Sequence, residues 1–250
     1  MLTEQERERF MRQIVMPGIG EEGQEILKNA KVLVVGSGGL GSPALYYLTV
    51  AGVGEIGIVD TDVVSLSNLN RQILHTEADL QRPKVESAVE KLQKLDASIR
   101  FHPMQVYLDE NNAQEILTGY DLIVDCVDND DTRYLINRWA VRLGIPLVEG
   151  GVRGLEGYIL PILPGKSPCY RCVYPEKTKR ASDPIPVLGG TAGAVGAMEA
   201  IVGIRMLLGQ SVPVGKLTFF QFAGLTSTQI EVKRDPHCPV CGQAPSEIVD

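Results

Sequence analysis

A doubly wound α/β sheet, continued by antiparallel strands in the C-terminal part, is the fold that this sequence predicts. Short apolar runs such as KVLVV at 31–35 are typical of strands buried on both faces. These runs alternate along the chain with segments of helical periodicity, as in parallel α/β proteins. A glycine-rich loop follows the first of them, where a βαβ unit would begin. We therefore expect a mostly parallel, Rossmann-like sheet.

The expected elements follow one another closely from the N-terminus. Charged amphipathic segments at 2–14 and 21–29 predict two helices ahead of the first strand. The apolar runs predict strands at 31–35, 55–60, 99–104, 121–126 and 146–149, and the intervening segments predict helices at 42–51, 84–95, 112–117 and 132–143.

The character of the sequence changes near residue 150. Glycine and β-forming residues fill 150–163, which suggests antiparallel strands, and alternating segments at 217–222 and 226–232 predict a hairpin. Charges and prolines in 176–186 indicate a mobile surface loop. The Gly/Ala-rich stretch 189–208 is expected to form a buried helix.

Composition argues against several classes of protein. The 250 residues include 24 Lys and Arg against 31 Asp and Glu, a formal net charge of -7. Nucleic acids and acidic membrane surfaces normally require a basic excess, so neither is an expected general partner. The charged N-terminus does not look like a signal peptide, and the most apolar stretch is interrupted by Glu199 and Arg205. We expect a cytoplasmic protein without a membrane span.

The loop at 36–41 reads GSGGLG and fits the pattern G-x-G-x-x-G between a strand and a helix. Glycines let the backbone approach a phosphate, and the helix N-terminus supplies free N–H groups and partial positive charge. Asp60, at the end of the next strand, can accept hydrogen bonds from ribose hydroxyls. A tight turn without ligand would leave the four glycines Gly36, Gly38, Gly39 and Gly41 unexplained. The motif alone does not separate NAD from ATP.

Two cations and two amides gather just beyond Asp60. Such a set suits a triphosphate better than the pyrophosphate of a dinucleotide, and adenylation requires charge neutralisation on the α-phosphate and on the leaving pyrophosphate. A solvated basic loop is the alternative. The chain shows no Tyr/Lys or His/Asp arrangement that would support a dehydrogenase, and fold analogy alone does not establish function. The residues are Asn68, Arg71, Gln72 and Lys84.

Asp128 follows the predicted strand that ends at Cys126. Ligands of doubly wound sheets bind outside the carboxyl ends of the strands, and a carboxylate there could hold Mg²⁺. The alternative is an ordinary turn residue, since 128–131 reads DNDD.

Four of the five cysteines form two Cys-x-x-Cys pairs, which in a cytoplasmic chain points to a metal rather than to disulfides. Four thiolates make a closed, structural zinc site without an open position for substrate. Buried cysteines or a redox pair are the alternatives. The fifth cysteine, Cys126, is expected in the core rather than in catalysis. The pairs are Cys169 with Cys172 and Cys238 with Cys241.

The chain resembles the MoeB/ThiF/HesA group, relatives of the ubiquitin-activating enzymes. The matching stretches spread over nearly the whole chain: RFMRQIVMPGIGEEGQ, VLVVGSGGLGSPALYYL, VDTDVVSLSNLNRQILH, RPKVESA, DLIVDCVDN, PCYRCVYPE and DPHCPVCG. The resemblance implies a homodimer with a doubly wound sheet. It also implies transfer of AMP from Mg-ATP to the C-terminal glycine of a ubiquitin-like sulfur carrier, after which the acyl adenylate receives sulfur.

The resemblance also implies roles for individual residues. Arg12, in the RQI stretch, would reach into the ATP site of the partner subunit. The catalytic set would be Arg12, Arg71, Lys84 and Asp128, and the nucleotide would be bound by Gly36, Gly38, Gly39, Gly41, Asp60, Asp62, Asn68, Gln72 and Asn129. We expect one adenylation domain over 1–250, with N-terminal helices (1–30), a nucleotide-binding core (31–150) and a zinc-stapled, carrier-binding part (151–250).

The loop after the first cysteine pair departs from the family pattern. Alignment on Val187-Leu188-Gly189 places Ser182 where many relatives carry a cysteine. Alcohols do not form persulfides or exchangeable thioesters as thiolates do, so we expect this chain to stop at the adenylate. Residues 191–196 are also richer in glycine and alanine than the family pattern, which leaves the mode of carrier-tail recognition open.

Several substrates remain possible at this stage. The leading hypothesis is a sulfur carrier for molybdopterin, thiamine or tRNA thiolation. A peptide or small-molecule carboxylate, as in the iron-guanylylpyridinol cofactor pathway, is the first alternative. A carboxylate on modified tRNA is disfavoured by the acidic charge balance. A non-enzymatic nucleotide-binding protein is disfavoured because it would not need Arg71, Lys84 and Asp128 together.

Overall fold

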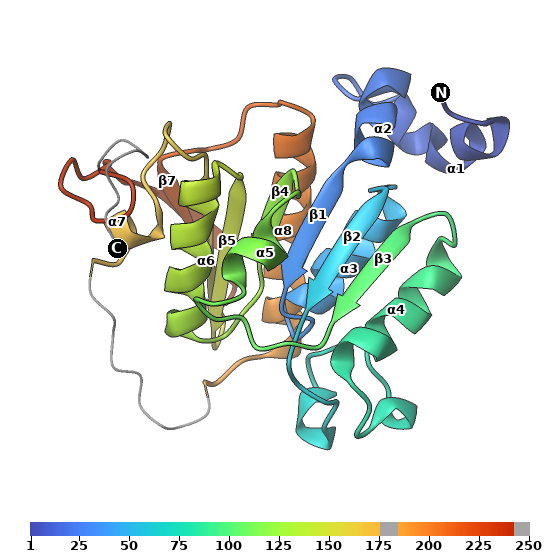
Figure 1. Cartoon of the computed structure of the whole chain (residues 1–250), viewed down its shortest axis with the longest axis horizontal. Coiled ribbons are helices and arrows are strands. Elements are labelled where there is room, and N and C mark those ends of the chain that lie inside the picture. Colours follow the sequence, from blue (N-terminus) through green and yellow to red (C-terminus); the bar gives the residue numbers. More distant parts are fainter. Residues whose placement is uncertain (176–184, 243–250) are drawn as a thin grey trace.

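The computed structural model describes residues 1–175 and 185–242 and contains one eight-stranded sheet (Figure 1). The strand order is β3-β2-β1-β4-β5-β6-β7-β8, with parallel pairing from β3 to β5 and antiparallel pairing from β5 to β8. The predicted fold class is confirmed. The strands are β1 (Lys31–Val35), β2 (Glu55–Val59), β3 (Arg100–Met104), β4 (Leu122–Asp125), β5 (Leu147–Arg153), β6 (Glu156–Ile162), β7 (Lys216–Gln221) and β8 (Thr226–Glu231).

The helices follow the predicted segments closely. The short α7 was not predicted, and β5 runs on to Arg153 because it pairs with β6 along its whole length. Most of the predicted 176–186 loop, residues 176–184, lies outside the described part of the chain. The helices are α1 (Glu4–Ile14), α2 (Gly20–Asn29), α3 (Gly41–Val50), α4 (Lys84–Leu95), α5 (Ala113–Leu117), α6 (Asp130–Leu143), α7 (Tyr170–Val173) and α8 (Gly189–Leu207), with 3₁₀ turns at Leu66–Asn68 and Glu77–Asp79.

Two hydrophobic layers sandwich the sheet because successive side chains of a strand point to opposite faces. In β1, Val32 and Val34 belong to the layer shared with α3, α4 and α8. Leu33 and Val35 belong to the opposite layer, shared with α5, α6 and α7. Figure 1 shows α5 and α6 on the near side of the sheet and α3 and α8 on the far side. A run of apolar residues in β1 is therefore required by burial on both faces.

The order of strands reverses at β1, which lies between β2 and β4. Such a topological switch point opens a crevice at the carboxyl ends of the strands. Gly36 leaves β1 there with φ of +95°, and a Cβ on it would lie 2.8 Å from the Cys126 carbonyl oxygen. Only glycine allows this close crossing of the β1 and β4 ends. Cys126 itself is buried at the end of β4, as expected.

Helix α8 is long and apolar enough for a membrane span by length and composition. One face of it packs on α3 and β5 and buries Val195 and Ala200. Only 39% of its most apolar window is buried, and Ile201 is exposed. The prediction of a buried helix is therefore wrong for the face that points away from the sheet. A helix in a single layer buries only the side that packs on the sheet.

Candidate active site

A cavity of about 1270 Å³ lies at the switch point, at the carboxyl ends of β1, β2 and β4. The loops after these strands converge on it because parallel strands end at the same edge of the sheet. Strands β5 and β6 and the segment 185–187 close its other side. Ten of the predicted site residues line it: Gly36, Gly38, Gly39, Asp60, Asp62, Arg71, Gln72, Lys84, Asp128 and Asn129.

The glycine loop is fixed to the end of β2 through Asp60. Asp60 Oδ2 accepts hydrogen bonds from the Ser37 amide at 2.8 Å and from the Ser37 hydroxyl at 2.9 Å. Its other oxygen, Oδ1, accepts one from the Asp62 amide at 3.0 Å. A carboxylate can accept further hydrogen bonds beyond these, so Asp60 keeps capacity for a ribose hydroxyl.

Arg71 stands beside the glycine loop. Its Nη1 donates to the Ser67 carbonyl at 2.9 Å and to Asn70 Oδ1 at 3.0 Å. A Cβ placed on Gly39 would lie 3.5 Å from the Arg71 Cγ, so the side chain runs along the loop. A planar guanidinium in this place can meet phosphate oxygens with several N–H groups at once.

Lys84 is the first residue of α4 and is buried, although a helix N-terminus disfavours a cation. Its Nζ donates to Asp62 Oδ2 at 2.7 Å, and the Asp62 side chain is 61% exposed. Burial of a lysine is costly without a paired anion. The solvent-facing carboxylate can rotate away, which would leave the ammonium group for an incoming phosphate.

Asp128 and Asn129 form the turn between β4 and α6. Asn129 is the N-cap of α6, and its Oδ1 accepts a hydrogen bond from the Thr132 amide at 2.9 Å. Asp128 is exposed at the cavity wall, after the strand that neighbours β1. This placement allows a carboxylate to share a divalent cation with a bound phosphate.

Three of the residues predicted for catalysis or nucleotide binding lie outside the cavity lining. Gly41 begins α3, and a Cβ on it would lie 1.9 Å from the Gly36 carbonyl oxygen, so its role visible here is close packing. Asn68 Oδ1 caps a 3₁₀ turn by accepting from the Ser65 amide at 3.1 Å. Arg12 is exposed on α1. Contact of these residues with nucleotide stays a prediction.

A buried ionic cluster beneath the cavity was not predicted. Arg133 lines the cavity and is 3% exposed, and its guanidinium binds the Gly150 carbonyl at 2.6 Å and the Tyr158 hydroxyl at 3.0 Å. It also contacts the carbonyl of Val127 and the carboxylate of Glu149. Arg133 thereby ties the turn that carries Asp128 to β5. Charged residues inside apolar segments, as in VDC and VEG, were the available sequence signal.

The cluster holds more carboxylates than cations. Asp125 and Glu199 are fully buried beside Arg133, and each has one carboxylate oxygen without a hydrogen-bond partner. Burial raises the pKa of Asp125 to about 6, partly opposed by Arg133. Burial also raises the pKa of Glu199 well above its usual value, and the Asp125 charge adds to this. Burial therefore favours the protonated, neutral form of Glu199 under the cavity.

The protein is expected to lose stability as pH rises above about 4, the ordinary pKa of a carboxyl group, and through about 6, the pKa of Asp125. A carboxyl group whose pKa is raised in the folded state binds more protons in the folded than in the unfolded protein. Its contribution to the free energy of unfolding is complete below the unfolded pKa of about 4. This contribution is lost as the pH rises through the pKa of the folded state. Glu199→Gln keeps the shape without the ionisation and should give a flatter dependence and higher stability at pH 8. Urea unfolding at a series of pH values measures this. Parallel pH profiles of wild type and variant would exclude Glu199 as the source.

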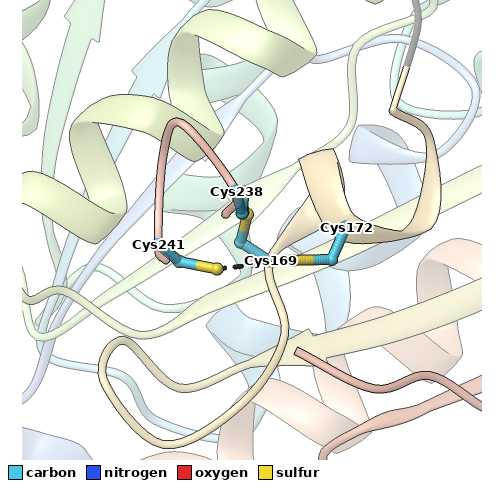
Figure 2. Close-up of side chains that lie close together, drawn as sticks. All are labelled: Cys169, Cys172, Cys238 and Cys241. Atoms are coloured by element: carbon cyan, nitrogen blue, oxygen red, sulfur yellow. Dashed lines mark hydrogen bonds between the residues drawn. The ribbon is translucent and has the colours of Figure 1, made fainter. Parts of the chain in front are cut away.

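The four paired cysteines converge at one place, where α7 meets the segment that carries Cys238 and Cys241 (Figure 2). Their Sγ atoms all lie within 4.8 Å of one another, with 3.7 Å between Cys169 and Cys238 and 3.4 Å between Cys172 and Cys241. Tetrahedral zinc with Zn–S bonds of 2.3 Å requires sulfur separations of about 3.8 Å. The arrangement therefore fits a closed four-thiolate site, as predicted.

The chemistry of the four sulfurs also fits a cation. The Cys169 thiol donates to the Cys241 sulfur and lowers the pKa of Cys241 to about 5, whereas burial raises the pKa of Cys172 to about 11. One thiolate in the group thus disfavours ionisation of the neighbouring thiols. A divalent cation removes this conflict because it stabilises every ligand as a thiolate.

Comparisons with known proteins agree with this architecture. Sulfur carrier protein adenylyltransferase of Thermus thermophilus is 42% identical over 260 residues, which cover 99% of this chain and 96% of that protein. The SAMP-activating enzyme E1 of Haloferax volcanii is 39% identical, with 94% and 89% covered. Arabidopsis thaliana adenylyltransferase and sulfurtransferase MOCS3 is 40% identical, and the match spans about half of it, 52%.

Solved structures show the same fold. Escherichia coli MccB with succinimide superposes with a TM-score of 0.85 at 24% identity, covering 97% of this chain and 75% of that one. MccB with MccA-N7isoASN gives a TM-score of 0.84 at 23% identity, with 95% and 75% covered. At this identity the likeness extends to the fold alone. The ThiF family model matches residues 10–240, and the chain belongs to the ThiF family.

Proposed function

We propose that this protein is an ATP-dependent adenylyltransferase that activates the C-terminal Gly-Gly carboxylate of a ubiquitin-like sulfur carrier. The observation that carries the proposal is the meeting of the glycine loop, Arg71, Lys84 and Asp128 around one cavity. Near full-length similarity to a sulfur carrier protein adenylyltransferase supports the choice of substrate. Molybdopterin, thiamine and tRNA thiolation are the pathways in which such a carrier would act.

The proposed reaction requires no covalent bond between the protein and its substrates. A carrier carboxylate oxygen bonds to the α-phosphorus of ATP, and the bond to the bridging oxygen breaks, so the electron pair leaves with pyrophosphate. Negative charge on the α-phosphate and on the leaving group must be neutralised in the transition state. Arg71 and Lys84, which line the cavity beside the glycine loop and at the start of α4, are the cations proposed for this task, and Asp60 would orient the ribose.

Two metals have different roles in this proposal. Mg²⁺ would be held by Asp128 together with phosphate oxygens, and when bound it supplies further charge neutralisation. Zinc would be held by Cys169, Cys172, Cys238 and Cys241. It would join the segment around residue 170 to the segment around residue 240, outside the cavity lining. Asn68, Gln72 and Asn129 would add hydrogen bonds to the nucleotide.

We further propose a homodimer in the cytoplasm. The exposed apolar side of α8, with Ile201 at 57% exposure, is a surface that a second copy could cover. Arg12 is exposed on α1 and would complete the partner's site by adding a further cation. Neither a membrane nor a nucleic acid is a proposed partner, in keeping with the net charge of -7.

Ser182 lies outside the described residues. Its hydroxyl cannot replace a thiolate in sulfur transfer. The adenylate is therefore the proposed end product, and sulfur would be delivered to it by another protein.

Pyrophosphate exchange into ATP tests the proposal directly. Exchange is expected with a Gly-Gly-terminated carrier from the same genome and is expected to fall at least about 100-fold when the last glycine is deleted, because the reacting carboxylate is then misplaced. The purified protein without carrier is the blank. Exchange that no Gly-Gly carrier stimulates would reject the sulfur-carrier assignment and favour a peptide or small-molecule carboxylate.

A further inference from the structure

His75 is a buried histidine that lies directly behind the glycine loop. It is 4% exposed, and it follows the segment of Arg71 and Gln72 without lining the cavity itself. One ring nitrogen, Nε2, lies 3.1 Å from the Ser37 carbonyl oxygen, and the other, Nδ1, lies 2.9 Å from Ser87 Oγ in α4. His75 therefore connects α4 to the phosphate loop through two hydrogen bonds.

The partners of the ring decide its tautomer. A carbonyl oxygen can only accept, so Nε2 must carry the proton that points to Ser37. Nδ1 of the neutral ring is then an acceptor and takes the hydroxyl proton of Ser87. Burial lowers the pKa of His75, and the nearby charges of Lys84 and Lys91 add to this, whereas the Ser37 hydrogen bond and Asp79 act in the opposite direction. The ring is consequently neutral at physiological pH.

A second layer of contacts orients the Ser87 hydroxyl so that it donates to His75 and accepts from Lys91. Lys91 Nζ donates to Ser87 Oγ at 2.9 Å and is paired with Asp79 at 2.6 Å. Asp79 also accepts from the Thr76 amide and hydroxyl, both at 2.7 Å. Because Ser87 Oγ accepts a hydrogen bond from Lys91, the hydroxyl proton of Ser87 is free to point to His75 Nδ1. The hydrogen-bond network runs from Asp79 through Lys91, Ser87 and His75 to the Ser37 carbonyl, and each donor in it meets an acceptor.

The Ser37 carbonyl shares one peptide unit with the Gly38 amide. No cis peptide bond occurs among residues 1–175 and 185–242, so this carbonyl and this N–H point in opposite directions. The carbonyl points inward to His75, and the Ser42 hydroxyl lies 3.4 Å from the same oxygen. Gly38 lines the cavity, and within the described residues its N–H makes no hydrogen bond to the chain.

A flip of this peptide unit would reverse the polarity of the loop. It would present a carbonyl oxygen to the cavity in place of an N–H, and an oxygen repels a phosphate. Glycine resists such a flip less than any other residue, because it tolerates both signs of φ. Glycine lets the loop backbone approach a phosphate closely, but it does not fix the orientation of the peptide. A contact from outside the loop is therefore needed to hold the peptide plane.

We propose that His75 is a positioning residue that holds the Ser37–Gly38 peptide so that the Gly38 N–H faces a phosphate of the bound nucleotide. The inference rests on the proposed function only in requiring that ATP phosphates lie on the glycine loop. His75 acts through the peptide and does not touch substrate. The chemical group recognised is the phosphate, so the nucleoside part of the ligand should be indifferent to His75.

Equilibrium binding of ATP and of adenosine to the full chain separates this role from a general structural one. His75→Leu removes the N–H and should weaken ATP binding about tenfold or more, the worth of a hydrogen bond to a charged group. Adenosine binding should be unchanged, because adenosine carries no phosphate. His75→Gln keeps an N–H donor at a similar reach and should stay within about threefold of wild type for both ligands.

Ser87→Ala serves as a second variant that leaves the ring in place. It removes the hydroxyl that keeps Nδ1 unprotonated, so the His75 tautomer is no longer determined. ATP binding should therefore weaken, as in His75→Leu but by a smaller factor. Adenosine binding should again be unchanged. This variant and His75→Gln carry the test if thermal unfolding shows that His75→Leu is not folded.

Equal weakening of ATP and adenosine, or unchanged ATP binding in His75→Leu, would overturn the inference. So would a glutamine variant that binds ATP as poorly as the leucine variant. Failure of the proposed function looks different: a wild-type protein without carrier-dependent exchange, yet with the phosphate-specific pattern of the variants, rejects the sulfur carrier and leaves the role of His75 in place.

Discussion

Asp128→Ala is expected to abolish adenylation while leaving the protein folded. Asp128 is exposed at the cavity wall at the carboxyl end of β4, where no core packing depends on it. Removal of a preorganised charge at the reacting phosphates should reduce the rate at least about 100-fold. Carrier-dependent pyrophosphate exchange measures the rate, and thermal unfolding shows whether the fold is retained.

Asp131→Ala is the matched control for this variant. Asp131 lies in the same acidic turn but belongs to the first turn of α6 and does not line the cavity. Its loss should cost about 0.3–1 kcal/mol of helix stabilisation and little activity. Exchange at the wild-type rate in Asp128→Ala, or an equal loss in both variants, would show that Asp128 has no special role with Mg²⁺.

Cys169→Ser is expected to release zinc and to destabilise the whole C-terminal part of the sheet. Cys169 is fully buried within the layer that also contains Leu160, Ile162 and Leu217, so the metal site is continuous with the core. Structural zinc contributes free energies of about 10–16 kcal/mol in small zinc peptides. Loss of only about 3 kcal/mol would lower the Tm of a chain of this size by roughly 6–12 °C.

Metal analysis of the purified wild type should find zinc in equimolar amount with the chain. Cys126→Ala is the control, because Cys126 is also a buried cysteine but lies at the end of β4, outside the cluster. It should retain the metal. A wild-type protein that contains no zinc and yet has an unchanged Tm in Cys169→Ser would contradict the structural role.

Strong local patterns account for the elements that were predicted well. The β1 strand and α4 were predicted at their observed bounds because a residue of special backbone geometry marks one limit of each. Gly36 ends β1, and Pro83 precedes the first residue of α4. The loop after β1 and the turn at 128–129 lie at one cavity because both follow parallel strands, which a sequence pattern can indicate.

The less accurate predictions concern contacts between distant segments. The extension of β5 to Arg153 depends on pairing with β6, and the half-exposed state of α8 depends on which face meets the sheet. The Asn68 side chain caps a local turn, and its contact with nucleotide stays a prediction. Residue type indicates capacity for a hydrogen bond, but not which neighbour receives it.

The sequence by itself determined the fold class, the family and the types of residue available for phosphate and metal, because these depend on periodicity and on short motifs. Only the tertiary structure decided that Arg133, Asp125 and Glu199 meet in one buried cluster, and that His75 reaches the Ser37 carbonyl. Both arrangements join segments far apart in the chain. Their energies come from burial and from hydrogen-bond geometry in a low-dielectric interior, and neither quantity exists until the helices have packed on the sheet.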